Sequence, residues 1–198
     1  MAEAGRPRPG NGLVLASASP RRSRLLRGLV DEFEIDPADI DERAGGDESP
    51  SALAGRLARA KAAAVAERHP GRPVLGSDTV VALDGEALGK PDDGDAARAM
   101  LARLSGRDHE VHSAVALIDA AGRWRDATVT TAVRFAELPP TWIERYVAAG
   151  EPMDKAGAYA IQGAAGAWIP AIRGSYTGVV GLPLYETACL LRQAGLLA

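Results

Sequence analysis

The stretch 13-LVLASASPRRSRLL-26 indicates how this chain begins to fold. Its first residues, Leu13–Ala16, form an apolar run that is typical of a buried strand. Ser19 is a favoured helix N-cap residue, and Pro20 suits the first helical position. The stretch therefore predicts a buried strand, a short turn and then a helix.

The expected helix carries two cations, Arg21 and Arg22, in its first turn. The helix macrodipole is positive there and favours acidic side chains instead. Phosphate binds both to helix N-termini and to guanidinium groups, and ligands of α/β sheets bind where strands end. A phosphate site would therefore explain the two arginines, whereas the alternative is that they point into solvent or pair with acidic residues elsewhere. The sequence has no GxxxxGK[ST] pattern, so we do not expect a P-loop.

Beyond this stretch, helical and strand patterns alternate along the chain. Apolar residues at helical spacing favour helices within residues 50–69, 89–107, 138–150 and 183–197. Apolar or alternating runs favour strands within residues 32–37, 73–85, 110–120 and 125–135, the last two as a hairpin around Ala121-Gly122. We expect the strand at 73–85 to break at Gly76–Asp78 and to end in an Asp-Gly turn. Together the patterns predict an α/β fold with a mixed twisted sheet flanked by helices.

The composition is that of an ordinary globular protein. The chain has 198 residues and a formal net charge of -3. This length suits one domain, which we expect to span residues 13–198 after a flexible leader at residues 1–12. The net charge does not indicate a nucleic-acid partner. With one cysteine, no apolar run long enough to span a membrane and no signal-peptide pattern, we expect a cytoplasmic protein without a membrane partner. A homodimer is compatible with the sequence, which does not argue for one.

Asp78 is the main candidate for chemistry. It interrupts an apolar strand pattern, and a buried carboxylate is costly unless it is paired or binds a metal. Its functional roles would be a Mg²⁺ ligand, a base that activates water, or both. The alternative is an aspartate that caps a turn beside Gly76 and Ser77. Glu42, in an acidic segment, is a second candidate metal ligand, for which a solvated acidic loop is the alternative.

The lysines stand out because arginine supplies 20 of the 23 basic residues. Only Lys61, Lys90 and Lys155 remain. Lysine is a compact point charge and arginine a planar fork, so the two do not replace each other in a tight site. Lys90 and Lys155 lie in expected loops, where binding groups tend to occur. Lys61 lies in an expected helix, where an exposed surface lysine is the alternative.

Gln162 lies among small residues in 157-GAYAIQGAAGAW-168, where nothing in the pattern requires an amide. An amide offers one donor and one acceptor, which complement the N3–H and O4 groups of thymine and uracil. A rotated amide could also meet cytosine. The alternative is that Gln162 bonds to a nearby backbone group.

Taken in order, these motifs resemble the Maf family of nucleoside triphosphate pyrophosphatases. The matching stretches are LASASPRR, AKA around Lys61, GSDTVV, LGKP, LSGR, EPMDKAGAYAIQG and SYTGVVGLPL, and they span about residues 13–195. The segment DKAGAYAIQG, with its glutamine, is similar to the branch that acts on dTTP and UTP. The branch that acts on 7-methyl-GTP has a differently built segment.

The resemblance implies an elongated α/β fold, related to inosine triphosphate pyrophosphatases, with a cleft between two lobes. It implies that a nucleoside triphosphate is cleaved at the α–β phosphoanhydride to the monophosphate and pyrophosphate, with a divalent cation, Mg²⁺ or Mn²⁺. It also implies roles for residues of this chain: Asp78 as the catalytic acid/base, Arg21, Thr79 and Gln162 in specificity, and Arg22, Lys61 and Lys90 on the phosphates. Ser17 and Lys155, which lie in the matching motifs, complete the expected substrate-binding set, and Asp78 and Glu42 are the expected metal ligands.

Two other functions stay open from the sequence. The Maf name is linked to septum formation, so a nucleotide-binding regulator of cell division with little turnover is one alternative. Within the enzyme class, 7-methyl-GTP and modified pyrimidine triphosphates are the other substrates to consider.

Overall fold

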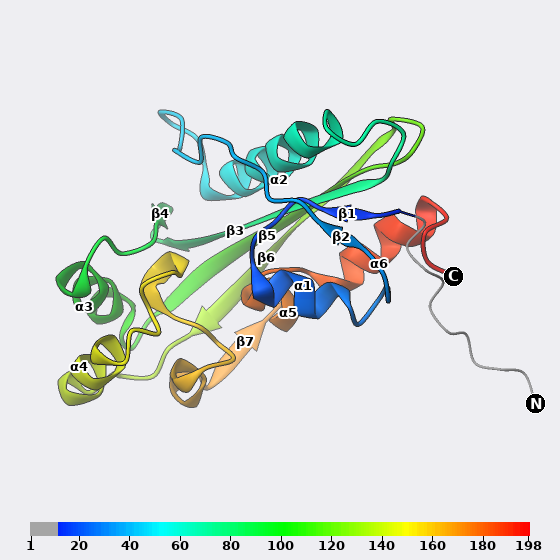
Figure 1. Ribbon diagram of the computed structural model, residues 1–198. Coiled ribbons are helices and arrows are strands. Elements are labelled where there is room, and N and C mark those ends of the chain that lie inside the picture. The colour runs from blue at the N-terminus through cyan, green and yellow to red at the C-terminus, as the bar shows by residue number, and fades with distance from the viewer. Residues whose placement is uncertain (1–11) are drawn as a thin grey trace, which may run out of the picture.

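A computed structural model describes residues 12–198 (Figure 1), so residues 1–11 of the expected leader lie outside the described part of the chain. The helices are α1 (Pro20–Leu26), α2 (Pro50–Ala66), α3 (Gly94–Leu104), α4 (Pro140–Ala148), α5 (Tyr176–Val180) and α6 (Leu184–Gln193), with two short 3₁₀ helices, η1 (Ala156–Ala158) and η2 (Ala164–Trp168). The strands are β1 (Val14–Leu15), β2 (Glu34–Ile35), β3 (Val74–Leu83), β4 (Glu86–Leu88), β5 (Asp108–Ile118), β6 (Trp124–Arg134) and β7 (Ala171–Arg173). None of these helices is both long and apolar enough to cross a membrane.

The strands form one mixed sheet of seven strands, which confirms the predicted α/β class. Their order is β2-β1-β3-β5-β6-β7, and β4 also pairs with β3. β1 runs parallel to both β2 and β3, whereas the pairs on the other side of β3 are antiparallel. The predicted hairpin is β5–β6, in which 11 residues of each strand pair.

Helices cover both faces of this sheet (Figure 1). α2 packs against β3 and β5 through Leu57 and Ala58. On the opposite side, α1 and α6 close a second cluster, around β1, which contains Leu26 and Leu191. α3 and α4 close a third cluster at the other end of β3, around Phe135. The apolar core therefore has a part at each end of the long strand β3.

The interruption predicted in the third strand is wrong, because β3 runs through Gly76–Asp78 without a break. Gly76 is there for packing: a Cβ at this position would lie 2.2 Å from the carbonyl oxygen of Ala58 and 2.7 Å from the backbone nitrogen of Ala62, both in α2. A glycine inside a strand can mark a close backbone approach rather than the end of pairing.

Two expected local signals are confirmed. The hydroxyl of Ser19 accepts a hydrogen bond from the Arg22 amide at 3.4 Å, and Pro20 occupies the first turn of α1. Asp84 and Gly85 have φ of 54° and 80°, the left-handed values that an Asp-Gly hairpin turn requires. This turn leads into β4, which the sequence did not predict, and α5 was not predicted either.

A gap in strand pairing opens the sheet in its middle. β1 pairs with β3 only at Val74 and Leu75, and β4 pairs with β3 only from Val81 to Leu83. Between these points, the edge of β3 that faces away from β5 has no strand partner among the described residues. Asp78 lies on this open edge, beside the carboxyl end of β1, which is where α/β sheets commonly bind ligands.

Candidate active site

A cavity of about 570 Å³ lies along the open edge of β3. Its walls come from the β1–α1 turn, α2, β3, the β4–α3 loop, the segment around η1 and the α5–α6 turn, so residues from both ends of the sheet face one space. All ten residues selected from the sequence line it, namely Ser17, Arg21, Arg22, Glu42, Lys61, Asp78, Thr79, Lys90, Lys155 and Gln162. The structure therefore brings the whole predicted set together.

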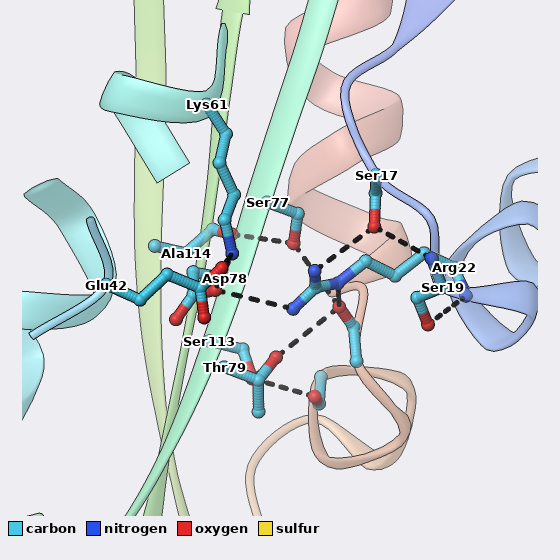
Figure 2. Close-up of polar contacts among 12 residues, drawn as sticks. Ser17, Ser19, Arg22, Glu42, Lys61, Ser77, Asp78, Thr79, Ser113 and Ala114 are labelled. Atoms are coloured by element: carbon cyan, nitrogen blue, oxygen red, sulfur yellow. Dashed lines mark hydrogen bonds and ion pairs between the residues drawn. The ribbon is translucent and has the colours of Figure 1, made fainter. Parts of the chain in front are cut away.

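Asp78, Lys61 and Glu42 lie together in the wall of this cavity (Figure 2). Lys61 is 7% exposed, so it is not a surface lysine. Its Nζ donates a hydrogen bond to Oδ1 of Asp78 at 2.6 Å and lies 2.6 Å from Oε1 of Glu42. Burial by itself would raise the pKa of Glu42, but the hydrogen bond and charge of Lys61 lower it below its usual value. One buried ammonium thus joins two carboxylates from different parts of the chain.

Arg22 approaches Asp78 from the α1 side (Figure 2). Its Nε donates to the carbonyl oxygen of Gly181 at 2.9 Å, and a terminal nitrogen donates to the hydroxyl of Ser17 at 3.2 Å. The other terminal nitrogen lies 3.8 Å from Oδ1 of Asp78. Burial lowers the pKa of Arg22, and the charges of Asp78 and Glu42 oppose that shift. The guanidinium is therefore held in place by protein groups and turned toward the carboxylate.

Arg21 and Lys155 meet at Asp154 on the exposed side of the cavity. A terminal nitrogen of Arg21 donates to Oδ2 of Asp154 at 3.4 Å, and Lys155 donates to the other carboxylate oxygen and to the carbonyl oxygen of Glu151. The hydrogen bond from Lys155 lowers the pKa of Asp154. Arg21 and Arg22 thus both have acidic partners, as expected if these arginines only pair with acidic residues elsewhere in the chain. Both arginines nevertheless also face the cavity.

The three remaining residues of the predicted set differ in whether their side chains already form hydrogen bonds within the protein. Lys90 and Gln162 are exposed, and their side chains make no hydrogen bond to another described residue. The hydroxyl of Thr79 lies 3.4 Å from the carbonyl oxygen of Gly181 and accepts from the Ser113 hydroxyl at 3.4 Å. Lys90 and Gln162 are therefore available to a ligand, whereas Thr79 is partly engaged within the protein.

Comparison with known proteins identifies the family of this chain. The Maf-like protein family matches residues 12–194. The chain belongs to this family. It is 54% identical over 185 residues to the dTTP/UTP pyrophosphatase of Myxococcus xanthus, covering 93% of each chain. It is 55% identical over 186 residues to the dTTP/UTP pyrophosphatase of Anaeromyxobacter dehalogenans strain 2CP-1, covering 92% of this chain and 94% of that one.

Among solved structures, the Maf chain is similar to a HAM1 protein from Coxiella burnetii. The two are 20% identical, with a TM-score of 0.48, over 92% of this chain and 99% of the other. This likeness is too distant to bear on function.

The carboxylates of this Maf protein suit a metal that arrives with its substrate. Within residues 12–198, no group of three or more His, Cys, Asp and Glu side chains could hold a metal ion. Asp78 and Glu42, however, flank the ammonium of Lys61, which contacts Oδ1 of one and Oε1 of the other, so each carboxylate keeps a second oxygen for a cation. Mg²⁺ at nucleotide sites is commonly held by one or two carboxylates and takes its other ligands from water and phosphate. The residues present fit that arrangement and not a preformed metal cage.

Sequence reasoning missed several groups of the site. The carbonyl oxygen of Gly181 accepts from Arg22 and lies 3.2 Å from the hydroxyl of Ser77, and Asp154 organises the exposed side. Apolar side chains also line part of the cavity, among them Val81, Leu88, Val111, Tyr159 and Val180. Gly181 and Asp154 both lie in the matching motifs. The role of Gly181 depends on its carbonyl group, which every residue type has, and in the motif with Asp154 only the neighbouring Lys155 was selected. The apolar wall could not be separated from the core by pattern alone.

Proposed function

We propose that this Maf protein hydrolyses dTTP and UTP to the monophosphate and pyrophosphate. The observation that carries the proposal is the buried carboxylate of Asp78, 2.6 Å from the Lys61 ammonium and facing Arg22, in a cavity large enough for a small ligand. The names of relatives that are more than half identical over more than nine tenths of both chains support the substrate.

Asp78 is the proposed base. Its carboxylate accepts a proton from a water molecule, whose oxygen forms a bond to the α-phosphorus while the bond between that phosphorus and the α–β bridging oxygen breaks. Pyrophosphate leaves with the bridging oxygen. Lys61, Arg22 and Lys90 surround the phosphates and stabilise the charge that develops on their oxygens, which is the main contribution to catalysis in reactions of this kind.

A divalent cation, Mg²⁺ or Mn²⁺, belongs to the proposal. Asp78 and Glu42 would hold it through the carboxylate oxygens that do not contact Lys61. When bound, the cation would neutralise part of the triphosphate charge.

The nucleobase would be recognised in a different part of the cavity from the phosphates. The amide of Gln162 can pair with the N3–H and O4 groups of thymine or uracil, and Arg21 and Thr79 are the further specificity positions. Val81 and Val111 offer an apolar wall for the pyrimidine ring. A single methyl group changes such binding by only roughly 10–200-fold, so modified pyrimidine triphosphates belong among the substrates.

The test is release of pyrophosphate from dTTP, UTP, dCTP and 7-methyl-GTP, with Mg²⁺ or Mn²⁺, by the wild type and by Asp78→Asn. We expect release from dTTP and UTP, lost in the variant, which should keep its fold at the assay temperature. Asp31→Asn, at an exposed site away from the cavity, is the matched control and should keep full activity. Normal turnover by Asp78→Asn would remove Asp78 from its role. Tight nucleotide binding without hydrolysis would favour the regulator alternative instead.

A further inference from the structure

His109 is a buried polar residue that the site described above does not use. It lies on β5, is 3% exposed and does not line the cavity. Its Nε2 is 2.7 Å from the hydroxyl of Tyr159, while its Nδ1 is buried with no hydrogen-bond partner among residues 12–198. The ring also stacks on Phe135. An apolar side chain would fill this space without leaving a nitrogen unpaired, so the bond to Tyr159 is what His109 adds.

Tyr159 connects this buried group to the cavity. The residue is 6% exposed and forms part of the cavity wall together with Ala160 and Gln162. Its ring packs edge-on against Phe135, with 5.0 Å between the ring centroids, and its hydroxyl reaches His109. Gln162 follows only three residues later, in the turn that the Gly163 amide closes by donating to the carbonyl oxygen of Ala160 at 3.0 Å.

The backbone just before Tyr159 needs such an anchor. Ala158 has a φ of 59°, a left-handed value that is unfavourable for a residue with a side chain. A conformation of this kind persists only where the surroundings fix it. Beyond it, the Ala160 amide donates to the Tyr146 hydroxyl at 3.2 Å. The bond between His109 and Tyr159 is the side-chain anchor between these two points.

We propose that His109 is a positioning residue, which through the Tyr159 hydroxyl fixes Gln162 in the cavity and so sets how tightly and how selectively the base is bound. The inference rests on the proposed function. His109 touches neither the cavity nor Asp78, so its effect falls on KM and base preference and leaves the chemical step unchanged.

The first comparison is between His109→Leu and His109→Gln. A glutamine amide can still reach the Tyr159 hydroxyl, whereas leucine leaves that hydroxyl buried and unpaired. We expect His109→Leu to raise the KM for dTTP about threefold to tenfold, with kcat within about twofold of the wild type, as the loss of one hydrogen bond implies. Its preference for dTTP over dCTP should narrow. His109→Gln should restore both values, and equal KM in His109→Leu and the wild type would overturn the inference.

A double variant separates positioning from stability. His109→Leu combined with Tyr159→Phe removes both polar groups, and an apolar pair of similar shape is close to neutral for stability. Its thermal midpoint should therefore return toward that of the wild type while the KM for dTTP stays raised. If the KM recovers together with the midpoint, His109 has only a structural role and the proposal is wrong.

Amide hydrogen exchange of residues 157–163 gives a readout that does not depend on turnover. We expect faster exchange in His109→Leu and in the double variant than in the wild type and His109→Gln. A wild type that releases no pyrophosphate would refute the proposed function, and the exchange result would still decide the inference. Unchanged exchange in both leucine variants would refute the positioning role by itself.

Discussion

Replacing Gly76 by alanine should disturb both the fold and the site through one contact. The new Cβ would lie 2.2 Å from the carbonyl oxygen of Ala58 and 2.7 Å from the backbone nitrogen of Ala62. These are backbone atoms of α2, which cannot rotate away as a side chain could. Lys61 lies between them in sequence, and its Nζ must reach Asp78 on β3.

The size of the effect follows from these distances. Ordinary contact begins near 3.4 Å, so α2 has to move from β3 by roughly 1 Å to admit the methyl group. Overpacking of this kind costs about 3 kcal/mol, the upper end of the usual range, because the helix must shift as a body. For a chain of this length, that corresponds to a fall of roughly 6–12 °C in Tm. A displacement of about 1 Å at a catalytic group can lower activity by up to a hundredfold.

Gly55→Ala is the matched control on the same helix. A Cβ at Gly55 would lie 3.6 Å from the Thr128 hydroxyl, an ordinary contact, and the residue sits inside α2. Alanine at such a position should stabilise the protein by about 0.5–1 kcal/mol. The two variants therefore make the same chemical change with opposite expected signs.

The assays are urea unfolding, for the free energy of unfolding, and pyrophosphate release from dTTP at a temperature where Gly76→Ala is folded. A midpoint for Gly76→Ala equal to that of the wild type would show that α2 does not press on the strand here. A destabilised variant with full activity would show instead that the place of α2 does not govern the contact between Lys61 and Asp78.

Two further predictions concern other parts of the chain. Burial lowers the pKa of His109 from 6.5 to about 4, against the opposing charge of Asp108, so between these values the unfolded chain binds a proton that the folded protein does not. The free energy of unfolding therefore falls as the pH falls. In urea unfolding, the wild type should lose about 3 kcal/mol more of this free energy than His109→Gln between pH 7 and pH 4. If the difference between the two proteins does not change with pH, the imidazole is not buried in its neutral form. Gly181 has a φ of 137°, so Gly181→Ala should cost more than about 1 kcal/mol and, by shifting the carbonyl that holds Arg22, lower kcat/KM at least about tenfold. Gly122→Ala, strained in the distant β5–β6 turn with φ of 77°, should lose similar stability and keep activity, and equal activity loss in both would argue against a specific role for Gly181.

Local signals predicted the parts of the fold that local chemistry governs. Ser19 and Pro20 marked the start of α1, and alternating runs marked the β5–β6 hairpin. The break expected at Gly76 failed because the reason for that glycine is a helix from elsewhere in the chain. α5 was missed because five residues, Tyr176–Val180, are too few for a helical period to show.

The sequence predicted which residues line the cavity but not how those residues contact one another. A carboxylate in an apolar strand and rare lysines single out Asp78 and Lys61 from the sequence, and both line the cavity. Nothing local could show that Lys61 bridges to Glu42, nor that Arg22 is held by the carbonyl oxygen of Gly181, 159 residues away. Such contacts depend on which elements the fold brings together, and backbone carbonyls are the same in every residue type.

The charges around the cavity bear on why two arginines begin α1. Five cations and three carboxylates line it, an excess of two positive charges within the described part of the chain: Arg21, Arg22, Lys61, Lys90 and Lys155 against Glu42, Asp78 and Asp154. A nucleoside triphosphate carries about four negative charges near neutral pH, so about two would remain, which one divalent cation neutralises. Without nucleotide, the charges at the centre already balance, because Lys61 and Arg22 face Asp78 and Glu42. The arginines therefore serve the empty site as partners of carboxylates, and the proposed divalent cation would be needed only once the nucleotide is bound. Chelation with EDTA should accordingly abolish hydrolysis and leave the Tm of the nucleotide-free protein unchanged.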